Sequence, residues 1–179
     1  MANRKMHLFG GTLFWGFFIG IFYALDLNTA WIDLGLGGDL SGLEFHSLWI
    51  VLSFMVAHFG AQLPDYDLIW EKILPHRNIM THSVFLPLII CTPLYFVSVS
   101  TKFLVPIYAF YLIGHASHLF FDLRPKSWAG TALIHLFWVN DDGRKTFPEK
   151  ASRLFLLING IIILVAGIIL LYFFQAWIK

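Results

Sequence analysis

The chain has 179 residues, of which 58% are hydrophobic and only 13% are charged. A soluble domain carries about 25% charged residues, so the polar groups are too few to cover a soluble globule. A net charge of +1 excludes a basic nucleic-acid-binding domain, and the high apolar content excludes a disordered or collagen-like chain. We therefore expect an all-α, polytopic integral membrane protein that forms a single domain over residues 1-179, with membrane lipids as partners and no nucleic acid.

Five long stretches without charged residues define the predicted transmembrane helices. A helix needs about 20 apolar residues to cross roughly 30 Å of hydrocarbon, and each stretch meets this length. A shorter charge-free stretch, 127-140, predicts a re-entrant or interfacial segment, with a sixth full span as the alternative. The five predicted spans cover about residues 6-25, 45-64, 83-101, 103-122 and 154-177.

The lysines and arginines indicate the orientation, because cytoplasmic segments are enriched in them. With the N-terminus in the cytoplasm, ten of the twelve lie inside, and Lys102 and Lys179 lie outside. We therefore expect a cytoplasmic N-terminus and a C-terminus on the outer side.

Seven of the eight histidines fall on the cytoplasmic side of this arrangement, beside three aspartates. An ionisable group in the bilayer costs about 2.5–3.5 kcal/mol even on the most lenient scale. Gathering so many on one face therefore predicts a metal or proton site. The residues are His7, His58, His76, His82, His115, His118 and His135, with Asp65, Asp67 and Asp122.

Helical spacing predicts part of the ligand set. His118 and Asp122 are four residues apart, so they share one helix face and can bind the same ion. His115 lies about 10 Å from Asp122 along the axis, so we expect it to serve a second ion or to support a ligand. His58 at similar depth is either an additional ligand or a hydrogen-bonding partner between helices.

Imidazole and carboxylate groups without thiolate suit a divalent ion, with zinc as the default for hydrolysis and Mn or Fe as alternatives. The candidate ligands outnumber those that one tetrahedral ion can use, which favours a site with two or more ions. Arg77, next to His76, is a candidate for holding an anionic substrate group. No organic cofactor site is predicted.

The motifs resemble the YdjM-like family of bacterial and archaeal inner-membrane proteins, to which metal-dependent hydrolysis is ascribed. The resemblance runs from about residue 6 to 139 and implies an inner-membrane location. Asn78 and Leu68 depart from it, because the family usually has Gly after His-Arg and often His after its second Asp. The matching motifs are His7, Leu63-Pro64-Asp65-Tyr66-Asp67, His76-Arg77 with Thr81-His82-Ser83, and Gly114-His115-Ala116-Ser117-His118 ending in Asp122.

The resemblance implies that a set of seven side chains binds metal. A more distant similarity to the zinc-dependent phospholipase C group implies phosphoester hydrolysis at a multi-zinc centre. The seven implied ligands are His7, Asp65, Asp67, His76, His82, His118 and Asp122.

These observations predict a membrane-bound, metal-dependent hydrolase that cleaves a lipid or lipid-linked phosphoester by metal-activated water. Asp67, if it does not bind metal, is the candidate general base, and Arg77 is the candidate substrate-binding residue. Two alternatives come from other classes of protein. One is an ion or proton transporter. The other is a non-catalytic scaffold that binds a soluble partner through the basic segment 144–153.

Overall fold

The computed structural model describes residues 4–24, 42–70, 75–98, 104–125, 127–129, 132–136 and 146–178. The described residues form α-helices, one 3-10 helix and isolated β-bridges, which confirms the all-α prediction. The elements are α1 (Arg4–Ala24), α2 (Gly42–Gln62), η2 (Leu63–Trp70), α3 (Phe85–Ser98), α4 (Leu104–Asp122) and α5 (Glu149–Ile178).

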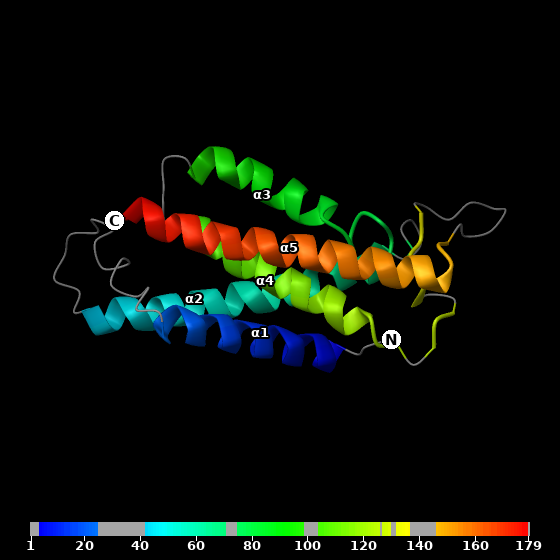
Figure 1. Cartoon of the computed structure of the whole chain (residues 1–179), viewed down its shortest axis with the longest axis horizontal. Coiled ribbons are helices and arrows are strands. Elements are labelled where there is room, and N and C mark those ends of the chain that lie inside the picture. The colour runs from blue at the N-terminus through cyan, green and yellow to red at the C-terminus, as the bar shows by residue number, and fades with distance from the viewer. Residues whose placement is uncertain are drawn as a thin grey trace.

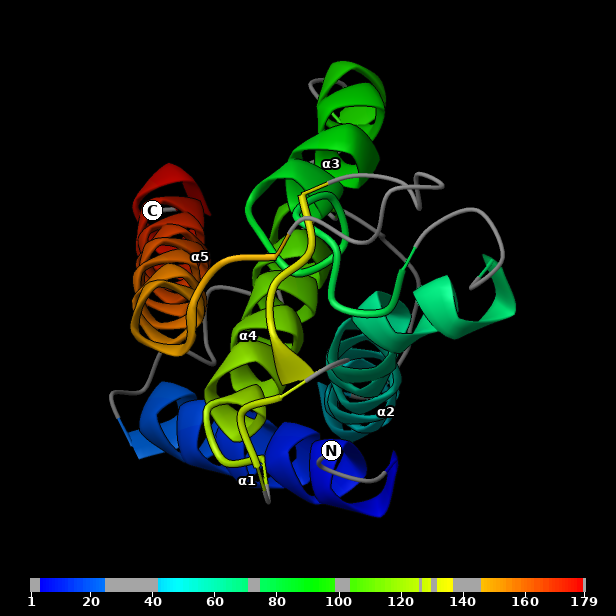
Figure 2. The ribbon, with the colours of Figure 1, turned by 90° about the vertical axis from the view of Figure 1, so that its right-hand side faces the viewer.

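Helix α4 is the centre of the bundle. It packs against α1, α2, α3 and α5, and these four helices surround it when the bundle is seen end-on (Figure 2). Successive helices run in opposite directions along the long axis (Figure 1). As a result, one end of the bundle, toward the right in Figure 1, contains η2, the starts of α1, α3 and α5, and the ends of α2 and α4. We refer to these segments as the polar end.

The bundle exposes apolar side chains and buries polar ones. Phe17 of α1, Met55 of α2 and Ile89 of α3 are 63%, 60% and 57% exposed, whereas Arg77 and His118 are fully buried. Soluble monomers expose contiguous apolar patches of only a few hundred Å², so these outer faces suit an apolar environment.

One helix among the described residues, Glu149–Tyr172 within α5, is long and apolar enough to span a membrane. The count of five spans stays a prediction. Helix α4 begins and ends within one residue of the predicted span 103-122, whereas α5 begins five residues before the predicted residue 154. The start of α5 extends into the basic segment because Pro148 and Glu149 favour a helix N-terminus.

Two glycines let the backbones of α2 and α4 touch. A Cβ atom at Gly114 would overlap the carbonyl oxygen of Ala57, and one at Gly60 would overlap that of Tyr111. Small residues at a crossing allow such close approach. One turn further along, this contact brings His118 of α4 to the backbone carbonyl of Ala61 in α2.

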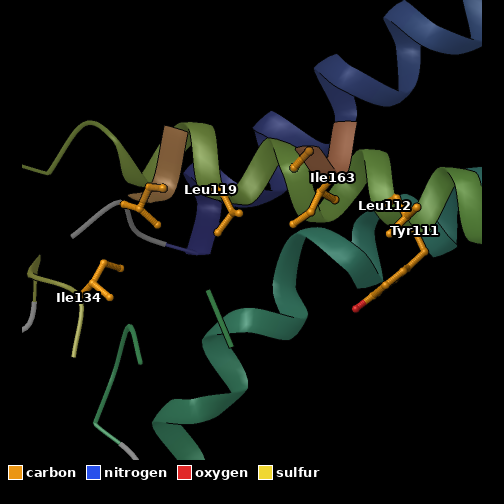
Figure 3. Packing of buried hydrophobic residues seen from close by; sticks show 7 residues of the cluster. Tyr111, Leu112, Leu119, Ile134 and Ile163 are labelled. Carbon is orange, nitrogen blue, oxygen red and sulfur yellow. The ribbon is translucent and has the colours of Figure 1, made fainter. Parts of the chain in front are cut away.

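Apolar packing joins α4 to α5 and to the loop that follows α4. Figure 3 shows Leu112 and Leu119 of α4 with Ile163 of α5 and Ile134 of the loop, all in one buried cluster. Close packing of these side chains gives many small van der Waals contacts, which are large in sum. The cluster therefore holds segment 132–136 against the polar end.

Segment 132–136 also pairs with the loop before α3. The N–H of His135 donates to the carbonyl of Arg77 at 2.9 Å, and the N–H of Ile79 donates to the carbonyl of His135 at 2.9 Å. The described part of the predicted segment 127-140, residues 127–129 and 132–136, thus packs across the polar end with bends and isolated β-bridges at His135. Residues 137–140 lie outside the described residues.

Replacing Gly114 with Ala should weaken the fold. The added methyl group overlaps backbone rather than a flexible side chain, so we expect the free energy of unfolding to fall by about 1–3 kcal/mol or more. The matched control is Gly16→Ala in α1, where nothing lies within 4 Å of the added Cβ and helix propensity should raise stability by up to about 1 kcal/mol. Thermal unfolding of the purified variants measures both effects, and equal melting temperatures would contradict the close contact.

Candidate metal centre

Histidine and aspartate side chains from four segments converge at the polar end. They come from α1, from η2, from the loop before α3 and from the end of α4. All are buried except Asp65, whose side chain is 21% exposed. The converging residues are His7, Asp65, His76, His82, His118 and Asp122.

The Nε2 atoms of the histidines face the two carboxylates. His7 Nε2 lies 3.8 Å from Asp65 Oδ2 and 3.5 Å from Asp122 Oδ1. His118 Nε2 lies 3.7 Å from Asp65 Oδ1 and 3.3 Å from Asp122 Oδ2. The two imidazole rings stack, with their centroids 3.9 Å apart. Separations of 3.3–3.8 Å are also those expected between neighbouring ligand atoms around one ion with bonds of about 2.0–2.2 Å.

The loop before α3 contributes two more Nε2 atoms to the same region. His76 Nε2 lies 4.0 Å from Asp65 Oδ1, and His82 Nε2 lies 3.3 Å from both Asp122 Oδ2 and His118 Nε2. Two bare imidazole nitrogens this close repel each other unless a cation or a proton lies between them. The pair is therefore suited to binding a cation.

Hydrogen bonds at Nδ1 explain why the Nε2 atoms are bare. We assign Nδ1–H of His118 as the donor to the Ala61 carbonyl at 2.8 Å and Nδ1–H of His76 as the donor to Asp67 Oδ1 at 2.8 Å. Metal-binding histidines almost always have such a partner behind the ring, because it fixes the tautomer and the ring orientation.

The hydroxyl group of Thr81 accepts the corresponding hydrogen bond from His82. Its Nδ1–H donates to Thr81 Oγ1 at 2.9 Å, and that hydroxyl donates to Asp67 Oδ2 at 2.9 Å. Burial lowers the pKa of the His82 imidazole below its ordinary value. His82 is therefore neutral near pH 7, as a metal ligand must be.

The side chains form three overlapping groups in which all ligand atoms lie within 4.8 Å of one another. Each imidazole Nε2 has one lone pair, so His82 and His118 can each bind one ion only. The group His82–His118–Asp122 shares a histidine with each of the other two groups, so it cannot bind an ion at the same time as they do. Those two groups share only Asp65, whose two oxygens can bind different ions. The donor set thus fits two ions bridged by Asp65, or one ion in the third group. The groups are His7–Asp65–His118, Asp65–His76–His82 and His82–His118–Asp122.

Asp67 lies next to the three ligand groups but belongs to none of them. We expected a ligand or a general base, but both of its oxygens accept hydrogen bonds from behind the cluster: from His76, from Thr81 and from the backbone N–H of Arg77 at 3.0 Å. Burial alone raises the pKa of the Asp67 carboxyl, but the hydrogen bond from His76 and the nearby ring of His82 outweigh burial and lower it. Asp67 is thus an ionised residue that positions histidines.

The guanidinium of Arg77, the predicted substrate-binding residue, makes its hydrogen bonds within the protein. Its guanidinium is fully buried, where it donates to Asp122 and, at 2.8 Å, to the carbonyl of Ala132. Its backbone has a φ of 56°, in the left-handed region that non-glycine residues rarely adopt. The hydrogen bonds of Arg77 therefore fix the orientation of Asp122 within the protein.

The two additional histidines lie outside the three ligand groups. His58 Nε2 pairs with Thr12 Oγ1 of α1 at 2.9 Å, and its Nδ1 bonds the carbonyl of Phe54 at 2.8 Å. His58 is therefore the hydrogen-bonding partner between helices that was one of its two predicted roles. His115 is fully buried next to the ring of Tyr111.

Several groups that shape the cluster were not predicted from the sequence. Thr81 lies directly before His82 in the motif, and this proximity was the one available signal. The roles of the Ala61 and Ala132 carbonyls cannot be predicted from the sequence, because every residue has a backbone carbonyl. His135, which was predicted to gather with the other histidines, is 2% exposed and lies outside the three ligand groups, and its backbone N–H donates to the carbonyl of Arg77.

No family model, no curated protein and no solved structure matches this chain. The resemblance to the YdjM-like family rests on the motifs alone and stays a prediction.

Replacing His118 with Ala should remove most of the bound metal, because His118 belongs to two of the three ligand groups. His58→Ala is the matched control, since His58 is an intramembrane candidate whose ring bonds Thr12 instead. Mass-spectrometric metal analysis of the purified proteins, after loading with zinc or manganese, measures ions per chain. Equal metal content in the two variants would contradict the assigned site.

Proposed function

We propose that the protein is a polytopic membrane hydrolase that uses one or two divalent ions, most suitably zinc, to cleave a phosphoester in a lipid or lipid-linked substrate. One observation carries this proposal: four histidine Nε2 atoms converge on two aspartates. Three of these imidazole rings make a hydrogen bond at Nδ1 that fixes their orientation. Divalent ions in such a site polarise a phosphoryl oxygen and lower the pKa of water to about 7.

The exposed apolar faces support the membrane location. They occur on α1, α2, α3 and α5, which surround α4. The start of α1 and the end of α5 lie at opposite ends of the bundle (Figure 1), as an odd number of spans requires. With the bias of lysine and arginine, this supports five spans in the inner membrane, with the polar end in the cytoplasmic leaflet.

Asp65 marks the side from which substrate reaches the cluster. Its side chain is 21% exposed, whereas the other side chains of the three ligand groups are at most 4% exposed. Tyr66 and Ile69 of the same 3-10 helix are 44% and 75% exposed. A polar opening beside apolar side chains at the end of the bundle fits a substrate whose charged headgroup is attached to a lipid.

The residues around the ligands fix the orientation of the ligand side chains and do not take part in the reaction. Asp67 keeps His76 in the tautomer whose Nε2 is bare, and Thr81 extends the same effect to His82. Arg77 balances the charge of Asp122 and prevents its carboxylate from rotating. Such preorganisation is what makes electrostatic stabilisation of a transition state effective.

Asp67→Asn separates the positioning role from that of a general base. Loss of a partner behind a ligand typically lowers metal affinity 10–100-fold, so we expect the variant to need that much more zinc for half-maximal activity and to regain most of the wild-type rate at saturation. Phosphorus NMR of phospholipids in detergent micelles measures hydrolysis. A rate loss that excess metal does not restore would make Asp67 the base. Metal-loaded wild-type protein that hydrolyses neither phospholipids nor polyisoprenyl-linked phosphoesters would overturn the proposed function.

Cysteine labelling tests the proposed orientation. In a Cys91→Ser background, Lys150→Cys should react with an impermeant maleimide only in inverted vesicles, because the start of α5 lies at the polar end. Lys179→Cys should react only in right-side-out vesicles. Labelling of both positions from the same side would show that α5 does not cross the membrane.

A further inference from the structure

Three buried polar side chains of α4 lie beyond the metal centre and lack hydrogen bonds. Tyr108, Tyr111 and His115 are 6%, 3% and 0% exposed. Within the described part of the chain, neither tyrosine hydroxyl nor either ring nitrogen of His115 has a hydrogen-bond partner. We call these three residues the α4 stripe.

The α4 stripe is continuous with the metal centre. Steps of three and four residues keep Tyr108, Tyr111 and His115 on one face of the helix, and the next step leads to His118. At 1.5 Å per residue, Tyr111 lies about 10 Å from His118 along the axis. The stripe therefore leads from the ligands of the metal toward the middle of the bundle.

Apolar groups surround the stripe. Phe59 of α2 lies near Tyr111, with ring centroids 6.3 Å apart, and Ile90 and Cys91 of α3 pack against the cluster that contains Tyr111. A buried polar group without a partner costs about 1–3 kcal/mol. Three such groups in succession, on a helix that also carries metal ligands, indicate that an occupant supplies the missing hydrogen bonds.

Water is a poor occupant of these positions. A buried water typically makes about three hydrogen bonds, and apolar cavities stay dry. The polar atoms of the stripe are separated by about one turn of helix, so a water at Tyr111 would have too few partners. A better occupant is largely apolar and carries isolated acceptors, each of which needs only one donor.

An acyl ester has this chemistry. Its carbonyl oxygen accepts a hydrogen bond from one hydroxyl, and its chain packs against apolar side chains. In a glycerophospholipid the ester carbonyls lie a few bonds from the phosphate, on the side toward the hydrocarbon. We propose that the α4 stripe binds the ester groups of a glycerophospholipid whose phosphate lies at the metal centre, a proposal that rests on the proposed function and names its substrate class.

Tyr111 lies on the side of α4 that faces α2 and α3. Its ring centroid is 6.3 Å from that of Phe59 in α2, and Cys91 of α3 packs against the cluster that contains Tyr111. Figure 2 shows these two helices on neighbouring sides of α4. Phe59 and Leu88 are 47% and 55% exposed, so both helices also present apolar side chains on the outer surface.

The proposal is tested by comparing two lipids that differ only in the carbonyls. The probes are dioleoyl phosphatidic acid and its dioleyl diether analogue, with binding measured by native mass spectrometry on metal-loaded and on chelator-treated protein. We expect wild-type protein to bind the diester roughly tenfold more tightly, as the loss of two hydrogen bonds predicts. A polyisoprenyl phosphate, which has a phosphate but no acyl ester carbonyl, should bind as weakly as the diether.

Conservative variants identify the residues responsible. The double variant Tyr108→Phe and Tyr111→Phe should lose the preference for the diester, and its melting temperature without lipid should stay equal or rise, because the removed hydroxyls have no hydrogen-bond partner among the described residues. Tyr66→Phe, at a 44% exposed position, is the matched control and should retain the preference. Equal binding of diester and diether by wild type, or an unchanged preference in the double variant, would overturn the proposal.

The outcome is separable from that of the proposed function. A diester preference that depends on the two tyrosines supports the ester site even if the metal-loaded protein hydrolyses no lipid. Hydrolysis that depends on His118 but proceeds equally on diester and diether supports the metal site and overturns the ester site.

Discussion

Burial of ionisable groups in an apolar bundle is the constraint on which this structure depends. A buried charge is tolerated only when it is paired and hydrogen-bonded, and the polar end satisfies this rule. Asp122 pairs with Arg77, and Asp67 accepts three hydrogen bonds. Once these pairs are made, the bare nitrogens that remain face a common region. The candidate cation site is formed by these remaining nitrogens and the carboxylates that they face.

The sequence predicted the residues of the site better than their roles. His118 and Asp122 were placed on one face by helical spacing alone, and the structure brings them together. Asp67 and Arg77 were assigned to chemistry because a carboxylate and a guanidinium near histidines suggest it. Their actual partners include the backbone N–H of Arg77 and the carbonyl of Ala132. Such partners depend on the path of the chain and cannot be identified from residue types.

The parts of the fold that depend on composition, such as the helices, were predictable from the sequence. The parts that depend on contacts between backbone groups were not. Charge-free runs of about 20 residues indicated helices, and α4 agrees closely with its predicted bounds. Segment 127-140 was too short for a span, but nothing in its residues indicated that His135 would pair with the loop before α3. The left-handed backbone of Arg77 had no signal either, since no glycine stands there.

The separation of the ligands along the chain has a consequence for biosynthesis. His7 comes from the first helix and Asp122 from the end of the fourth, yet their side-chain atoms are 3.5 Å apart. A ribosome makes the chain from its N-terminus, so His7 is inserted long before its partner exists. The two candidate ligand groups that contain His118 can therefore form only after α4 has been made, whereas the group Asp65–His76–His82 can form before it. Completion of the candidate site thus depends on the fourth helix of the chain.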